Sequence, residues 1–275
     1  MVAKSSSNTS FKKLTSIKQL KLQANIIRED IITSLKEAKS GHSAGPLGMA
    51  DIFTALYFNV LKHNPKKPND KNRDRFILSN GHICPVLYAT MANCGYFPKK
   101  ELLTLRKLGS RLQGHPHRQA LPGLETTSGP LGSGLSQAAG MALVFKREKT
   151  PQKVWVSLGD GEQNEGNHWE AVMFAAKEKL SNIIAITDRN YIQIDGNTED
   201  VMPLDSLKKK YLAFNWNVVE INGNDMPVIL KTLKAARSNK HKPLMIIAKT
   251  IPGKGVSFME GDYHWHGTLR KQLKH

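Results

Sequence analysis

Short apolar runs alternate with longer amphipathic stretches along the chain. Runs rich in Val, Ile and Trp predict strands at 75–78, 153–158, 182–188, 216–221 and 243–249. Apolar residues at helical spacing predict helices at 17–39, 49–61, 83–91, 99–108, 136–149, 205–214 and 225–237. Strands that alternate with helices favour an α/β fold with a mostly parallel sheet and helices on both faces. The pattern leaves the strand order open.

The length and composition set the class of protein. With 275 residues, 40% of them hydrophobic, the chain can bury the full core of one large domain. We place this domain at 17–275, after a flexible tail at 1–16. No apolar run reaches membrane-spanning length, and the first fifteen residues lack the apolar centre of a secretory signal. Cys84 and Cys94 lack metal-ligand spacing, which predicts free, packed thiols and a cytoplasmic location.

The formal charge of +17 raises the question of nucleic-acid binding. The lysines are scattered, however, and their densest groups lack interleaved aromatic residues or a recognised nucleic-acid motif. We therefore expect a solvated basic surface that attracts phosphorylated substrates or an acidic partner, and no nucleic-acid or membrane partner.

A glycine-flanked carboxylate ends the second predicted strand. In Gly159-Asp160-Gly161, glycines let backbone N–H groups approach a ligand, and a helix start nearby favours phosphate. A carboxylate among phosphate-binding amides requires a divalent cation between them, so Asp160 is a candidate Mg²⁺ or Ca²⁺ ligand. On its own the motif is equally typical of a plain strand-to-helix turn.

The next strand supplies a second oxygen ligand. Asn190 follows it, and the 27 residues between Gly161 and Arg189 suit one helix and one return strand. The spacing resembles the thiamine diphosphate fingerprint, in which GDG is followed by a pair of asparagines. Arg189 stands where the first asparagine belongs, whereas the second, which holds the metal in the family, is present as Asn190.

Four histidines lie in glycine-rich segments outside the helical and strand patterns. His42 lies in the turn 41–48, which on its own also suits a helix cap, and His82 follows the first predicted strand. His115 lies in the long loop 109–134, whose length and glycine content favour a functional loop. His266 lies close to the chain end.

Seven segments, in order along nearly the whole chain, resemble the N-terminal, diphosphate-binding half of transketolase. They are SGHSAGPLGMA at 40–50, LSNGH at 78–82, GHP at 114–116, TTSGPLGSG at 126–134, GDGEQNEG at 159–166, DRNYIQIDG at 188–196 and WHG at 265–267. The resemblance implies the thiamine diphosphate-binding fold, with thiamine diphosphate and Mg²⁺ (or Ca²⁺) as cofactors.

The resemblance also assigns site residues. The metal ligands are Asp160, Asn190 and the main-chain oxygen of Ile192. The cofactor lies against Gly129 and Leu131 at its pyrimidine end, Gly161 at its diphosphate, and also His82, Glu165, Asn190 and His266, of which Glu165 matches an acidic residue at the subunit contact. The catalytic histidines are His42, His82, His115 and His266, whereas His117 and His264 have no firm counterpart.

The activity that the resemblance implies is transfer of a two-carbon ketol unit from a ketose phosphate to an aldose phosphate. Imidazoles titrate near neutral pH, so we expect His42 and His266 to transfer protons at the substrate oxygens, and His115 to orient a hydroxyl of the transferred fragment.

The family also requires a pyrimidine-binding domain with an activating glutamate, and no such domain follows before residue 275. The expectation is a split enzyme, in which this chain and a C-terminal subunit form a heterotetramer. Three alternatives stay open: an enzyme acting on pyruvate, such as a deoxyxylulose-phosphate synthase or a 2-oxo-acid dehydrogenase; a transketolase for a modified or sulfonated ketose; and a non-catalytic cofactor-binding subunit.

Overall fold

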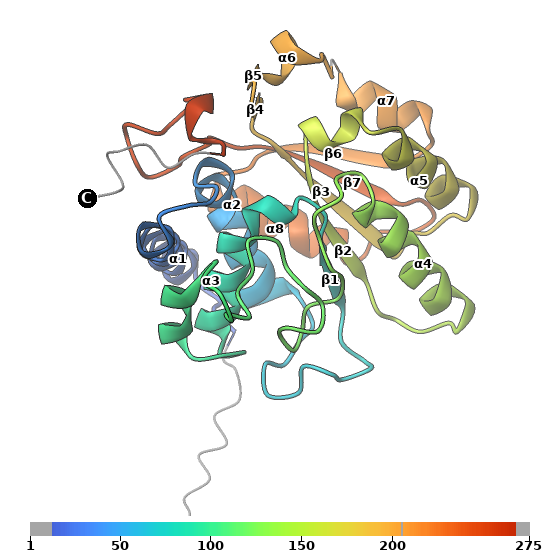
Figure 1. The fold of residues 1–275 in the computed structure, drawn as a ribbon. Coiled ribbons are helices and arrows are strands. Elements are labelled where there is room, and N and C mark those ends of the chain that lie inside the picture. Colours follow the sequence, from blue (N-terminus) through green and yellow to red (C-terminus); the bar gives the residue numbers. More distant parts are fainter. Residues whose placement is uncertain (1–12, 205, 268–275) are drawn as a thin grey trace, which may run out of the picture.

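The central sheet has five parallel strands. A computed structural model describes residues 13–204 and 206–267 of the chain (Figure 1). The strands run in the order β1 (Arg75–Leu78), β2 (Val154–Gly159), β3 (Ile183–Arg189), β7 (Leu244–Lys249) and β6 (Asn217–Asn222). Each neighbouring pair is parallel, which confirms the predicted sheet.

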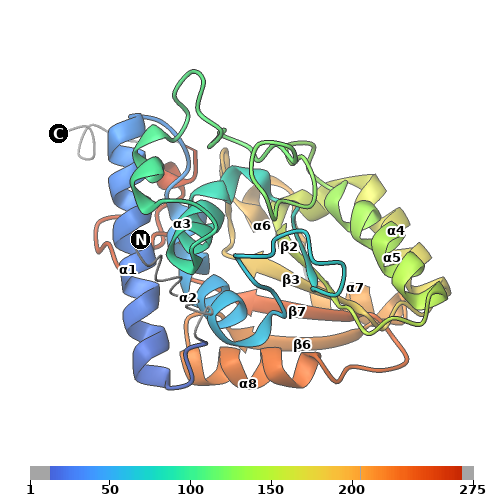
Figure 2. The ribbon, with the colours of Figure 1, turned by 90° about the horizontal axis from the view of Figure 1, so that it is seen from below.

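Two helical layers cover the sheet, as the sequence predicts. One layer contains α1 (Ile17–Ala38), α2 (Ala44–Ala55), α3 (Cys84–Cys94) and α8 (Met226–Ala236). The other contains α4 (Gly134–Arg147), α5 (Gly166–Lys177) and α7 (Leu207–Ala213). Figure 2 shows the sheet between them. The buried side chains form a separate apolar core on each face. Because both faces are covered, β3 is buried along its whole length.

The connections between the strands run over both faces of the sheet. The crossover from β2 to β3 passes through α5 on one face, whereas the crossover from β6 to β7 passes through α8 on the other. The winding therefore changes direction between the neighbouring strands β3 and β7. Parallel α/β sheets bind ligands beyond the carboxyl ends of their strands, and here the residues after β1, β2 and β3 line a cleft.

The helix α1 begins and ends where its caps dictate. Ser16 accepts a hydrogen bond from the Gln19 amide, and Lys39 adopts a left-handed conformation at the other end. Just before it, the Leu14 amide donates to the Phe58 carbonyl at 2.9 Å. Of the tail predicted at 1–16, residues 1–12 lie outside the described residues.

Two predicted helices differ from the observed ones. α2 begins at Ala44, five residues before the predicted start, and ends in a π-helical turn at Leu56–Val60. Its early turns need small residues, because a Cβ on Gly48 would lie 2.9 Å from the Ile251 carbonyl oxygen. The predicted helix at 99–108 is wrong beyond its first half, since only a 3₁₀ helix at Lys99–Thr104 forms.

Short elements complete the rim above the sheet. They are 3₁₀ turns at Gly81–Ile83, Gly161–Asn164 and Tyr263–Trp265, a hairpin of β4 (Ile192–Gln193) with β5 (Gly196–Asn197), and the helix α6 (Thr198–Val201). Cys84 and Cys94 are buried and free, as predicted. Among the described residues, every helix is too short or too polar to cross a membrane.

Candidate functional site

A cleft of about 460 Å³ lies beyond the carboxyl ends of β1, β2 and β3. Ten of the predicted site residues line it: His42, His82, His115, Gly129, Leu131, Asp160, Gly161, Asn190, Ile192 and His266. They come from segments far apart in the sequence, which the fold brings together. Glu165 is the exception, because it is exposed at the start of α5 and is not part of the lining.

Asp160 lies at the floor of this cleft and is almost fully buried. Its Oδ1 accepts a hydrogen bond from the Gly161 amide at 2.8 Å, and its Oδ2 accepts one from the Tyr191 amide at 2.8 Å. The second bond joins Asp160 to the residue directly after Asn190. The two predicted metal ligands are therefore neighbours at the tips of adjacent strands.

Asn190 is fixed by bonds at both ends of its amide. Its Oδ1 accepts from the Ile192 amide at 3.0 Å, and its Nδ2 donates to Asp188 at 2.8 Å. Thr250 donates to the other oxygen of Asp188. Burial raises the pKa of Asp188 to about 7, and burial also raises the pKa of Asp160. Two buried carboxyl groups favour a cation at this floor.

The oxygen donors suit a hard divalent cation. Asp160 offers a carboxylate, Asn190 an amide oxygen and Ile192 a main-chain oxygen, and all three residues line the cleft. These are ligand types that Mg²⁺ and Ca²⁺ prefer. Within residues 13–204 and 206–267, no three His, Cys, Asp or Glu side chains form a metal site by themselves.

Arg189, which replaces the first asparagine of the fingerprint, is buried beside Asp160. Its Nη1 lies 3.2 Å from the Asp160 carboxylate and 2.8 Å from the Thr198 hydroxyl, and its Nη2 pairs with Glu199. Its guanidinium carbon lies 4.1 Å from the centroid of the Tyr191 ring. Arg189 thus joins the floor carboxylate to α6 and to Tyr191, directly before β4.

Three of the four histidines form a compact cluster above this floor. The ring centroids of His42, His82 and His266 lie 5.0 to 5.8 Å apart. Burial lowers the pKa of His42 and of His266 to about 4, and it lowers the pKa of His82 well below its ordinary range. The expectation that these imidazoles titrate near neutrality is wrong for the structure, because burial disfavours their charged form.

The cleft contains buried polar atoms that have no partner in the described chain. They are Nδ1 of His42, Nδ1 of His266 and Nδ2 of Asn80. Buried polar atoms are almost always hydrogen-bonded in native proteins, so these nitrogens mark positions for polar groups of a ligand. Asn80 lies in the LSNGH segment, but no pattern in the sequence assigned it a role.

Glu162 is a further cleft residue that sequence reasoning missed. Its Oε1 accepts from the Ser79 hydroxyl and, at 2.8 Å, from the Gly132 amide. Its Oε2 accepts from the Gly159 amide at 2.9 Å. One buried carboxylate therefore ties the ends of β1 and β2 to the loop that carries Gly129 and Leu131. The signal in the sequence was an acidic residue directly after GDG.

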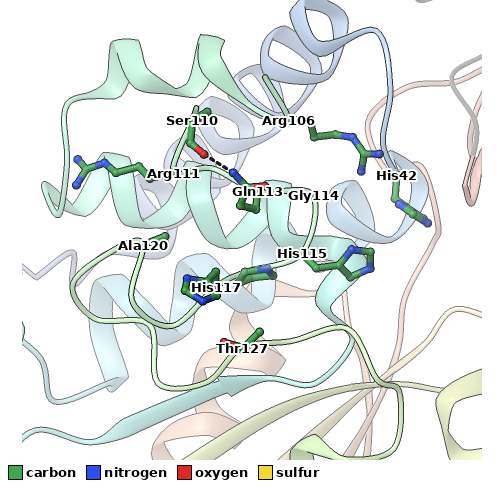
Figure 3. A pocket seen from close by; sticks show the side chains of 11 residues that line it. His42, Arg106, Ser110, Arg111, Gln113, Gly114, His115, His117, Ala120 and Thr127 are labelled. Atoms are coloured by element: carbon green, nitrogen blue, oxygen red, sulfur yellow. Dashed lines mark hydrogen bonds between the residues drawn. The ribbon is translucent and has the colours of Figure 1, made fainter. Parts of the chain in front are cut away.

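His117 and His264, which the resemblance left without a role, lie outside the cleft. His117 is exposed on the wall of a neighbouring cavity, which His42 and His115 also line (Figure 3). His264 lies 2.6 Å from the Asp262 carboxylate.

Comparison with known proteins identifies the family. The family model "Transketolase, thiamine diphosphate binding domain" matches residues 19–273. The chain is 42% identical over 250 residues to one subunit of the apulose-4-phosphate transketolase of Phocaeicola vulgatus, covering 91% of this chain and 89% of the relative. It is 41% identical to the 6-deoxy-6-sulfo-D-fructose transketolase subunit SqwG of a Clostridium species, covering 90% of each.

Solved structures agree with these relatives. Transketolase from Campylobacter jejuni superposes with a TM-score of 0.87 at 36% identity, covering 92% of this chain and 41% of that one. Transketolase from Leishmania mexicana superposes with a TM-score of 0.85 at 36% identity, covering 93% and 39%. The chain thus spans about two fifths of these solved transketolases.

The fold and the cleft define a thiamine diphosphate-binding α/β protein of the transferase class. More particularly, the chain belongs to the family of the transketolase thiamine diphosphate-binding domain and is a transketolase subunit.

Proposed function

We propose that this chain is the cofactor-binding subunit of a split transketolase. In this proposal it transfers a two-carbon ketol unit from a ketose with a terminal anionic group to an aldose, together with a C-terminal subunit in a heterotetramer. The observation that carries the proposal is the neutral histidine cluster directly above the oxygen-rich floor of one cleft. Relatives that the alignment covers to about nine tenths of their length are named as transketolase subunits, which supports a split enzyme.

The cleft residues suit the two ends of the cofactor. Asp160, Asn190 and Ile192 would hold Mg²⁺ or Ca²⁺ and thereby the diphosphate, while Gly129 and Leu131 would line the pyrimidine end. When bound, thiamine diphosphate supplies the carbon nucleophile and the electron sink for ketol transfer. The protein supplies position, exclusion of water and hydrogen bonds.

The histidines would act as neutral hydrogen-bonding groups toward the sugar. With a pKa of about 4, His42 and His266 are uncharged at neutral pH, so each ring nitrogen pair offers one donor and one acceptor. Each imidazole would accept a proton from a hydroxyl group of the substrate and later return it. His115, which is exposed at the rim of the cleft, would orient the transferred fragment.

Apolar side chains at the mouth of the cleft support the presence of a partner. Leu131 is 38% exposed and Ile194 is 66% exposed, although both line the cleft. A partner protein that covers them would exclude water and supply the activating glutamate. The buried, free thiols of Cys84 and Cys94 suit a reducing cytoplasm.

The test is reconstitution. The purified chain is assayed with thiamine diphosphate, Mg²⁺ and ketose phosphates, alone and with a purified C-terminal transketolase subunit. We expect turnover only from the mixture, with ketose phosphates, including apulose 4-phosphate, or sulfofructose preferred to pyruvate. Full activity from the chain alone refutes the split enzyme, and a preference for pyruvate refutes the transketolase assignment.

A further inference from the structure

A buried glutamine, Gln163, lies behind the floor of the cofactor cleft. It belongs to the 3₁₀ turn Gly161–Asn164, three residues after the candidate metal ligand Asp160, and it is only 1% exposed. It does not line the cleft, so a bound cofactor or sugar would not contact it. Burying an amide costs free energy unless the amide is hydrogen-bonded. The partners of this side chain therefore indicate what Gln163 does.

The amide nitrogen of Gln163 joins the strands β2 and β3. Its Nε2 donates to the Gly159 carbonyl at 3.1 Å and to the Thr187 hydroxyl at 2.8 Å. Gly159 directly precedes Asp160 at the end of β2, and Thr187 lies three residues before Asn190 on β3. One side chain thus spans the two strand ends that carry the candidate metal ligands.

The amide oxygen of Gln163 is fixed by two further buried side chains. Its Oε1 accepts from the Tyr211 hydroxyl at 2.9 Å, and that hydroxyl lies 2.6 Å from Nε2 of His168. Burial raises the pKa of Tyr211 well above its ordinary range, so the hydroxyl keeps its proton and can donate. Because His168 is on α5 and Tyr211 is on α7, the network reaches from the floor of the cleft to both helices.

Trp169 holds the main chain of the same glutamine. Its Nε1 donates to the Gln163 carbonyl at 2.8 Å, and its ring centroid lies 5.4 Å from that of Tyr211. The turn after Asp160 is therefore anchored on the helical layer through both its main chain and its side chain.

The donors and acceptors of this network fix the positions of its hydrogens. The Gln163 nitrogen must face the Gly159 carbonyl, because an oxygen there would oppose another acceptor. Tyr211 then gives its proton to Gln163, and His168 must donate to Tyr211 from Nε2. This leaves Nδ1 of His168 without a hydrogen, which agrees with its lack of a partner in the part of the chain that the structure describes.

We propose that Gln163 is a positioning residue, which sets the spacing of Asp160 and Asn190 and thereby the affinity of the cleft for its divalent cation. This inference rests on the proposed function, in which both residues hold Mg²⁺ or Ca²⁺. Glu162 fixes the amide of Gly159 and Gln163 fixes its carbonyl, so the residue before Asp160 is held on both sides. Residues that orient metal ligands typically contribute about 10–100-fold to metal affinity.

Three variants separate positioning from stability. Gln163→Met keeps the length of the side chain but removes its donor and its acceptor, whereas Tyr211→Phe removes only the hydroxyl that holds Gln163. Ile229→Ala is the control, because Ile229 is buried on α8 in the core of the opposite face, where its truncation lowers stability without touching the network. Urea unfolding measures stability. Isothermal titration calorimetry measures the affinity of the full chain for Mg²⁺ at a saturating concentration of thiamine diphosphate.

We expect Gln163→Met to bind Mg²⁺ about 10–100-fold more weakly than the wild type. Tyr211→Phe should bind about 2–10-fold more weakly, because one of the bonds that fix Gln163 is lost. Ile229→Ala should keep wild-type affinity although it unfolds more easily.

Wild-type affinity in a folded Gln163→Met protein overturns the inference, and if that variant does not fold, wild-type affinity in Tyr211→Phe overturns it. An equal loss of affinity in Ile229→Ala overturns it as well, because the effect would then follow stability alone. A wild-type chain that binds no Mg²⁺ refutes the metal site itself, and with it both the proposed function and the inference.

A second measurement needs no metal. Nitrogen NMR chemical shifts show which ring nitrogen of His168 carries the proton, and we expect Nε2. The indole N–H signal of Trp169 reports on the turn, so it should shift in Gln163→Met and stay in place in Ile229→Ala. A proton on Nδ1 of His168 would show that Tyr211 does not hold Gln163, and an indole signal that Gln163→Met leaves in place would show that the side chain does not position the turn. Either result overturns the inference.

Discussion

Substitution of Glu162 by Gln tests how the cleft is held together. The buried carboxylate accepts hydrogen bonds from the Ser79 hydroxyl and from the amides of Gly132 and Gly159. Glutamine has the same shape but offers only one acceptor oxygen. If that oxygen keeps the bonds to Ser79 and Gly132, the new NH₂ group faces the Gly159 amide, and two donors oppose each other.

The expected cost follows from this mismatch. A buried donor left without an acceptor costs about 1–3 kcal/mol, and the lost bond to a charged acceptor is of similar size. We therefore expect Glu162→Gln to lower the free energy of unfolding by about 2–4 kcal/mol. For a domain of this size that corresponds to a melting temperature lower by roughly 5–15 °C.

Urea unfolding followed by circular dichroism measures the change. Glu170→Gln is the control, since Glu170 is exposed on α5 and should change stability by less than about 0.5 kcal/mol. Because Glu162 also holds the loop of Gly129 and Leu131, thiamine diphosphate should bind the variant more weakly. A Glu162→Gln protein as stable as the control would show that the three bonds contribute little.

Three further predictions concern the floor of the cleft and the buried His168 on α5. Asp160→Asn should abolish Mg²⁺-dependent binding of thiamine diphosphate in isothermal titration calorimetry, and unchanged affinity would remove Asp160 from the metal site. Arg189→Asn removes a cation 3.2 Å from Asp160, so Mg²⁺ should bind about tenfold more tightly. The melting temperature should fall, because the ion pair with Glu199 is lost. Weaker Mg²⁺ binding would contradict this reasoning. Burial lowers the pKa of His168 from 6.5 to about 4, so as the pH falls the unfolded chain binds a proton at this residue before the folded chain does. The contribution of neutral His168 to stability is therefore fully present above pH 6.5 and is lost as the pH falls toward 4. Between pH 7 and pH 5, the free energy of unfolding of His168→Phe, measured with urea, should therefore fall by about 2 kcal/mol less than that of the wild type. Parallel pH profiles of the two proteins would show that His168 does not cause this pH dependence.

The strands and their direction were predictable because a parallel sheet buried on both faces needs continuous apolar runs. The NIIAITD run, for example, is β3, with every residue from Ile183 to Arg189 buried. The strand order was left open, although β7 (LMIIAK) is apolar and buried up to its last residue, whereas β6 (NVVEIN) carries polar residues and is largely exposed, as is typical of an edge strand. Which helix covers which face decides the order, and that choice depends on tertiary packing.

The positions of the site residues were predictable to a greater extent than their chemistry. Asp160 and Asn190 follow strands, so their convergence at one sheet edge needs only the parallel topology. The protonation of His42 and His266 depends on how deeply other segments bury them, which no local pattern records. The left-handed conformation of Arg106 was not predictable either, because the helical pattern of 99–108 gave no sign that the chain turns there.

The charges along the cleft follow an order that suits the ligands of the proposed function. Asp160 and Asp188 place carboxyl groups at the floor, and the imidazoles of His42 and His266 above them are neutral at pH 7. On the proposed function, a cation and its diphosphate would bind at the acidic end, and the uncharged reacting carbons of the sugar would contact neutral imidazoles. A charged imidazole at this position would bind an anionic group among the reacting carbons, so the burial that keeps His42 and His266 neutral suits uncharged sugar hydroxyls there.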